Sequence, residues 1–96
     1  MLEWQLIEFA MFRQDDGVDA VTKYILCKHD DETFGVLIQK YVMKDGNMLF
    51  EEQCESQHKY NRLDALSFAK LCSIHKVLPS TYLEIEADLR ASNLVL

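Results

Sequence analysis

Two cysteine–histidine pairs contain the side chains of this sequence that are best suited to metal or nucleophilic chemistry. Cys54 precedes His58 with three residues between them, and Cys72 precedes His75 with two. Thiolate sulfur and imidazole nitrogen can together complete a tetrahedral zinc shell, and an adjacent histidine activates a cysteine as a nucleophile. These four residues define one candidate function, a Cys/His metal-binding protein or a small enzyme.

The surroundings of these four residues favour a structural role instead. Their spacing departs from that of common zinc fingers, and the apolar neighbours of Cys72 are typical of a core thiol. No glycine-rich elbow or oxyanion-forming turn follows a cysteine or serine. The paired acids lie in turns or on an edge strand, where solvent prevents the pKa separation that acid–base catalysis needs. We therefore expect two buried thiols, two surface imidazoles, no metal, no cofactor and no enzymatic activity.

Short acidic turns separate the elements that would position these side chains. The turn sequences are Asp15-Asp16-Gly17, residues 29–32 and residues 44–47, and they divide the first part of the chain into four apolar-rich runs, residues 3–13, 18–27, 33–43 and 48–56. Asp45-Gly46 is typical of a tight hairpin, because both residues tolerate a positive φ. The run 3–13 carries apolar residues on both parities, which fits a buried strand or a short amphipathic helix. We favour the strand.

The second and third runs are apolar on both faces of the predicted strands. In the second run, Val21, Ile25 and Cys27 alternate with Ala20, Tyr24 and Leu26. In the third run, Phe34, Val36, Ile38 and Val42 alternate with Leu37, Tyr41 and Met43. Successive side chains of a strand point to opposite faces, so the predicted sheet needs cover on both sides.

Two helices are predicted after the strands. Asn61 is a good N-cap for a helix from Arg62 to about His75, and apolar residues on a wide sector predict that this helix is mostly buried: Leu63, Leu66, Leu71 and Ile74 on one side, Ala65, Phe68, Ala69 and Cys72 on another. Pro79 starts a short helix through about Leu89, with Tyr82, Ile85 and Leu89 inward and Glu84, Glu86 and Asp88 outward. The fold class is therefore α+β, a four-stranded antiparallel sheet followed by one long and one short C-terminal helix, in a single domain spanning 1–96.

The C-terminal half carries a family resemblance. The segment 77–89, Val-Leu-Pro-Ser-Thr-Tyr-Leu-Glu-Ile-Glu-Ala-Asp-Leu, follows a helix and a sheet that contains the pair Phe34-Gly35. This pattern resembles a family of small uncharacterised proteins of clostridia-type Firmicutes, with a sheet, a C-terminal helix and a Val-x-Pro-x-x-Leu step. The resemblance covers roughly the last two thirds of the chain and departs from the family at Ala87, where an acid is expected. It implies a fold and no activity.

Composition narrows the partners that we expect. Sixteen acidic and ten basic residues give a formal net charge of -6, which repels nucleic-acid backbones and anionic membranes and suits basic partners. The three cysteines are odd in number and widely spaced, and no charged-then-apolar leader is recognisable, so we expect a reducing cytoplasm. The longest apolar stretch is too short to cross a bilayer. We expect no membrane span and no direct nucleic-acid binding.

These observations favour a nonenzymatic interaction protein. Two helices cannot cover both faces of so apolar a sheet, so a second copy or another protein is expected over the face that carries Tyr24, Leu37 and Tyr41. Glu84, Glu86 and Asp88 are expected to contact a basic partner. The leading hypothesis is a homodimeric protein-binding regulator or inhibitor of phage or mobile-element type, such as an anti-CRISPR, acting on a basic nucleic-acid-binding protein.

Overall fold

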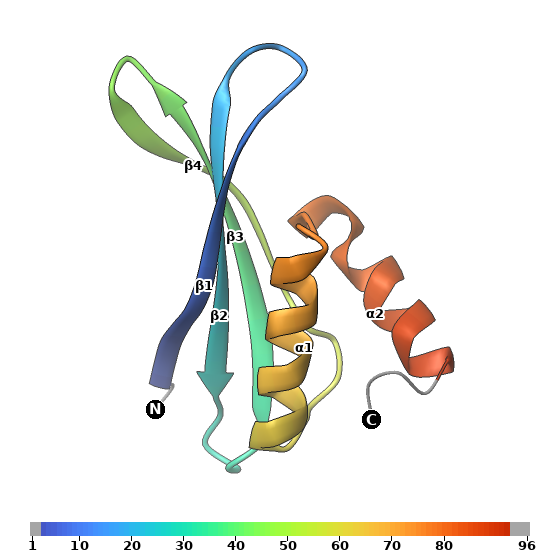
Figure 1. Ribbon diagram of the computed structural model, residues 1–96. Helices are drawn as coiled ribbons and strands as arrows, with labels where there is room; N and C mark the ends of the chain where they lie inside the picture. Colours follow the sequence, from blue (N-terminus) through green and yellow to red (C-terminus); the bar gives the residue numbers. More distant parts are fainter. Residues whose placement is uncertain (1–2, 93–96) are drawn as a thin grey trace.

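A four-stranded antiparallel sheet precedes two helices in the computed structural model, which describes residues 3–92 (Figure 1). The strands are β1 (Glu3–Arg13), β2 (Asp19–Lys28), β3 (Phe34–Lys44) and β4 (Asn47–Glu55). They pair in the order β1-β2-β3-β4. The helix α1 (Arg62–Ile74) follows, and the 3-10 turn η1 (Pro79–Thr81) leads into α2 (Tyr82–Ala91). The predicted α+β fold class is confirmed.

The first apolar run is a strand, as favoured from the sequence. β1 pairs antiparallel with β2, from Glu3 opposite Lys28 to Arg13 opposite Asp19. A register shift between Leu6 and Glu8 marks a β-bulge, which places an extra residue in one strand and changes the parity of the residues after it. Ile7 packs against the main core, while Leu6 and Phe9 are more than half exposed. The bulge explains why apolar residues occupy both parities of this run.

The β3–β4 hairpin forms at the predicted Asp-Gly turn. Asp45 has φ 52° and Gly46 has φ 79°, the pair of positive values that a type I′ turn requires. This turn twists in the same sense as the flanking strands, and it sets Met43 opposite Met48. The turn therefore sets the register of the hairpin as far as Tyr41 opposite Phe50, after which a register shift between Tyr41 and Lys40 changes it.

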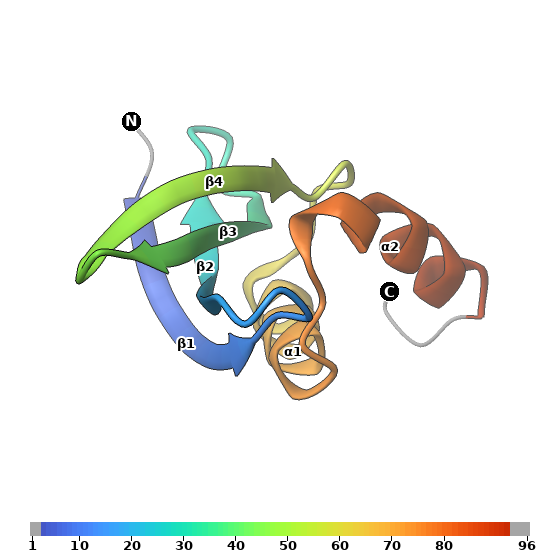
Figure 2. The same cartoon turned by 90° about the horizontal axis from the view of Figure 1, so that it is seen from above.

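The helix α1 lies against one face of the sheet, and α2 lies beside it on the same side, beyond the end of β4 (Figure 2). The Asn61 side chain caps α1 by accepting a hydrogen bond from the Asp64 amide at 2.8 Å. The helix buries a single stripe of residues, namely Ala65, Phe68, Ala69 and Cys72. The prediction of a mostly buried helix is wrong, because Leu63 and Ile74 are 71% and 73% exposed. With the sheet on one side only, a helix of this length has one contact face.

Aromatic side chains fill the core between α1 and the sheet. The ring of Phe68 lies 5.5 Å from that of Tyr60 and 5.6 Å from that of Tyr82, measured between centroids. Tyr82 is buried and its hydroxyl donates to the Val36 carbonyl at 2.9 Å. Because buried hydroxyls need partners, this bond fixes the start of α2 against β3. Within residues 3–92, neither helix has the length and apolar character needed to cross a bilayer.

Candidate protein-binding surface

The second face of the sheet has no helix over it in either view (Figures 1 and 2). Strand register identifies its side chains, since Trp4 pairs with Cys27, Leu6 with Ile25 and Ile25 with Leu37. We call this surface the open face. It comprises Trp4, Leu6, Phe9, Met11, Arg13, Asp19, Val21, Lys23, Ile25, Cys27, Leu37, Gln39, Tyr41, Met43, Met48, Phe50, Gln53 and Glu55.

The open face is buried at its centre and apolar at its exposed flanks. Ile25, Cys27 and Leu37 form a small cluster of their own, each less than a tenth exposed. On the outer strands six large apolar side chains are about half exposed, namely Trp4 (53%), Leu6 (52%), Phe9 (56%), Met11 (62%), Met48 (44%) and Phe50 (54%). Apolar side chains exposed along both outer strands make this face a candidate interaction surface.

Polar side chains on the open face bond to one another. The Tyr41 hydroxyl donates to Gln39 Oε1 at 3.2 Å, and Gln39 Nε2 donates to Gln53 Oε1 at 3.0 Å. Lys23 Nζ lies 4.7 Å from the centroid of the Tyr41 ring, within the range of a cation–π contact. The Tyr41 ring also meets Phe50 edge-on at 5.7 Å. This network lowers the cost of removing these groups from water.

Two of the three sheet residues predicted to bind a partner lie on the open face. Leu37 and Tyr41 share it, but Tyr24 pairs with Ile38 on the face that α1 covers. Tyr24 is fully buried and its hydroxyl donates to the Val77 carbonyl at 3.0 Å; burial raises its pKa to about 12. The prediction for Tyr24 is wrong, because its position in β2 puts its side chain on the other face of the sheet from Ile25 and Cys27.

The largest contributors to the open face lie in β1 and were not predicted from the sequence. Trp4, Leu6, Phe9 and Met11 are all more than half exposed. Their alternation was masked by Ile7, which the bulge turns toward the core. If a bulge is placed inside the run, these four side chains separate from the ones that face the core.

The acidic residues of α2 divide between surface and core. Glu84 and Asp88 are exposed, as predicted. Glu86 is buried, so the prediction that it points outward is wrong. Its carboxylate accepts hydrogen bonds from the Gln57 amide at 2.8 Å, from the His58 amide at 3.3 Å and from the Tyr60 hydroxyl. These donors explain how a carboxylate is accommodated in the interior.

The cysteine–histidine pairs do not form a metal-holding cluster. Among the residues that the structure describes, no group of three or more His, Cys, Asp or Glu side chains is arranged to hold a metal ion. Cys72 is buried, and burial followed by the nearby Glu86 charge raises its pKa to about 12. Cys54 is half-buried with a raised pKa, largely for the same reason, and His58 and His75 are exposed. Raised thiol pKa values oppose the thiolate form that both metal binding and nucleophilic attack require.

Comparison with protein-family models, with curated proteins and with solved structures finds no match. The resemblance to the Firmicutes family therefore stays a prediction, and the function is argued from the surface itself.

Proposed function

We propose that this protein is a small nonenzymatic binding protein that dimerises through the open face and acts as a regulator or inhibitor of a basic protein partner. The observation that supports the dimer is the open face, where six large apolar side chains are about half exposed. The partner for this face is a second copy of the chain, related by a two-fold axis that brings each open face onto the other.

The area of the open face is suited to a dimer of modest size. A fully buried aromatic side chain removes about 150–250 Å² from water, so six large side chains at half exposure offer on the order of 600 Å² per chain, against about 800 Å² per partner in a standard interface. Tyr41 and Met43 are partly exposed and add to this area. Little surface beyond the open face is needed to complete a stable contact.

The charge distribution also favours a second copy over the open face. Two chains of net charge -6 repel each other, and this repulsion is least where the contact carries no net charge. The charged members of the open face are Arg13, Asp19, Lys23 and Glu55, two of each sign. The acidic residues Glu84 and Asp88 lie on α2, on the other side of the sheet (Figure 1).

The acidic exterior supports the regulatory part of the proposal. Dimerisation leaves Glu84 and Asp88 of both chains exposed, which doubles the negative surface available to a basic partner. Such a surface competes with nucleic-acid phosphates for a cationic channel, the mode of action expected of an anti-CRISPR or a similar inhibitor encoded by a phage or mobile element. A cytoplasmic location suits this role.

A photo-crosslinking experiment tests the contact. A benzophenone amino acid replaces Phe9 in one variant and Leu63 in another, since both side chains are apolar and exposed but only Phe9 belongs to the open face. Irradiation is expected to give a covalent dimer from position 9 and none from position 63. Equal dimer yields at both positions, or no dimer from either, would argue against the open face as the dimer contact.

A further inference from the structure

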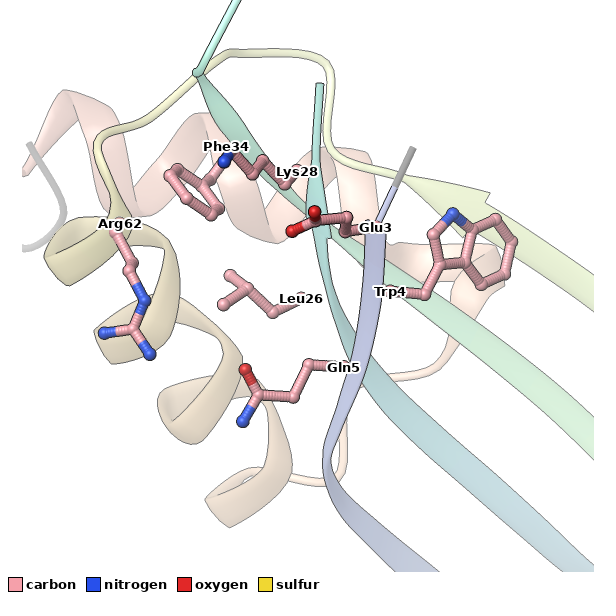
Figure 3. A pocket seen from close by; sticks show the side chains of 7 residues that line it. All are labelled: Glu3, Trp4, Gln5, Leu26, Lys28, Phe34 and Arg62. Atoms are coloured by element: carbon pink, nitrogen blue, oxygen red, sulfur yellow. The ribbon is translucent and has the colours of Figure 1, made fainter. Parts of the chain in front are cut away.

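A pocket of about 400 Å³ lies on the helix-covered side of the sheet, between the first residues of β1 and the first turn of α1. Figure 3 shows Leu26 and Phe34 at its apolar wall, Glu3, Gln5 and Lys28 on the strands, and Arg62 reaching in from α1. The Trp4 ring points away from these groups, toward the opposite side of the sheet. A volume in this range is typical of sites for small organic ligands, which occupy about 300–1,000 Å³.

Among the described residues, no carboxylate forms an ion pair with either of the two cations at this pocket. The ion pairs within residues 3–92 join Arg13 to Asp19, Lys40 to Glu51 and Lys59 to Asp31. Lys28 and Arg62 take part in none of these pairs, although Glu3 stands directly opposite Lys28 in the register of β1 and β2. Among the lining residues that the structure describes, two cations outweigh one carboxylate, so this lining carries a net positive charge within an acidic protein.

The position of Arg62 is unfavourable for the helix that carries it. Arg62 is the first residue of α1, where the helix dipole places partial positive charge and acidic residues are preferred. The N-cap Asn61 and the first-turn Asp64 already supply the usual stabilisation of this end. A cation at position 62 is therefore electrostatically unfavourable for α1, and a bound anion would relieve this by pairing with the guanidinium.

From this geometry we propose that the pocket binds a small amphipathic anion. The anionic head, a carboxylate or a phosphate monoester, is held by Arg62, because a guanidinium group forms paired hydrogen bonds with either kind of head. Lys28, whose ammonium group lies apart from Arg62 in Figure 3, adds to the positive charge of the pocket. The alkyl or ring portion packs on Leu26 and Phe34. This site is separate from the open face and does not depend on dimerisation.

Octanoate is the probe for the proposal, and amide chemical shifts in a 15N-labelled sample are the measurement. Saturable shifts are expected at Leu26, Phe34 and Arg62, and 1-octanol, which has the same chain without the charge, should give none at equal concentration. Octyl phosphate separates the two kinds of head, since the tighter of the two anions identifies the preferred one. Shifts with octanol equal to those with octanoate, or octanoate shifts that map to Phe9 and Phe50, would overturn the proposal.

Charge-matched variants complete the test. Arg62→Gln is expected to weaken octanoate binding at least about tenfold, the loss that corresponds to one charge-assisted hydrogen-bonded contact. Lys70→Gln removes the same charge from an exposed position of α1 outside the pocket and should bind octanoate as the unmodified protein does. Thermal melts confirm that both variants are folded. Unchanged affinity in Arg62→Gln, or an equal loss in Lys70→Gln, refutes the assignment of Arg62 as the anion-binding group.

Discussion

Glu86 illustrates at the scale of one residue how partners distant in sequence determine burial. Its position four residues after Tyr82 places it on the inward side of α2. A carboxylate is nevertheless expected at the surface unless hydrogen-bond donors contact it in the interior. The donors come from Gln57, His58 and Tyr60. Their approach depends on how the segment after β4 folds back, which helical periodicity does not encode. The sequence could therefore not predict this contact.

Glu86→Ala should destabilise the protein by about 3 kcal/mol or more, because it leaves two amides and a buried phenol without their acceptor, at about 1–3 kcal/mol for each unsatisfied group. Glu84→Ala, on the exposed side of the same helix, should change stability by less than about 0.5 kcal/mol. Urea denaturation of both variants measures the difference. Equal effects would show that the Glu86 contacts contribute nothing beyond those of a surface acid.

The buried thiols and Tyr24 predict a loss of stability in alkali. Burial raises the pKa of Cys72 from 9.0 to about 12, that of Cys27 from 9.0 to about 11, and that of Tyr24 from 10.0 to about 12. The folded state holds these protons more tightly than the unfolded state. The contribution of the three protonated groups to the free energy of unfolding is therefore complete below about pH 9 and is lost as the pH rises toward about 12.

The unfolding free energy should fall across this window by up to about 1.4 kcal/mol per pH unit for each titrating group. Urea midpoints measured at intervals from neutral pH into this range follow the loss. Cys72→Ala should show a shallower decline than the unmodified protein, since one of the groups is gone. A midpoint that is flat across the window would contradict the burial of these groups.

At the scale of the element, the bounds of α1 could be predicted from sequence periodicity, but its buried side could not. The bounds of the helix and its Asn61 cap were predicted closely, because capping and the 3.6-residue repeat are local properties. Its apolar sector was too wide to identify the buried stripe, and Leu63 and Ile74 proved exposed. Which stripe is buried depends on the single sheet face against which the helix packs.

The orientation of α1 is tested by a pair of substitutions. Phe68 is fully buried and contacts the rings of Tyr60 and Tyr82, so Phe68→Ala should cost about 3–5 kcal/mol through loss of contacts and formation of a cavity. Leu63→Ala should cost less than about 0.5 kcal/mol, because the side chain is 71% exposed. Chemical denaturation checks both values. A small effect of Phe68→Ala would place this residue on the surface and contradict the packing.

At the scale of the whole molecule, local signals predicted the order and type of the elements. The acidic turns, the alternation of apolar residues along the strands and the proline at the start of the second helix were enough to predict an antiparallel sheet followed by helices. The assignment of faces required the tertiary structure, since both faces of β2 and β3 are apolar and either one was suited to contact α1. Tyr24 was misplaced for this reason, and the bulge in β1 concealed the side chains that dominate the open face.

The proposed basic partner gives a prediction for the acidic surface of α2. Glu84→Lys and Asp88→Lys should slow association with the partner and leave dissociation nearly unchanged, because exposed charges mainly steer encounter. The effect should shrink as salt is added, since screening acts over about 10 Å at 0.1 M salt. Asp15→Lys, an equal charge reversal at the exposed β1–β2 turn, serves as the control. Association rates that are unchanged in both α2 variants would remove α2 from the interface.

Dimerisation through the open face is the central claim, and sedimentation equilibrium over a wide range of concentrations tests it most directly. The unmodified protein should be a dimer, and Phe9→Asp and Tyr41→Glu should be folded monomers, since each places a charge in the apolar contact. Leu63→Asp makes a similar change at an exposed site on α1 and should stay a dimer. An unmodified protein that is monomeric at every concentration, or a Leu63→Asp variant that dissociates as fully as Phe9→Asp, would contradict the account.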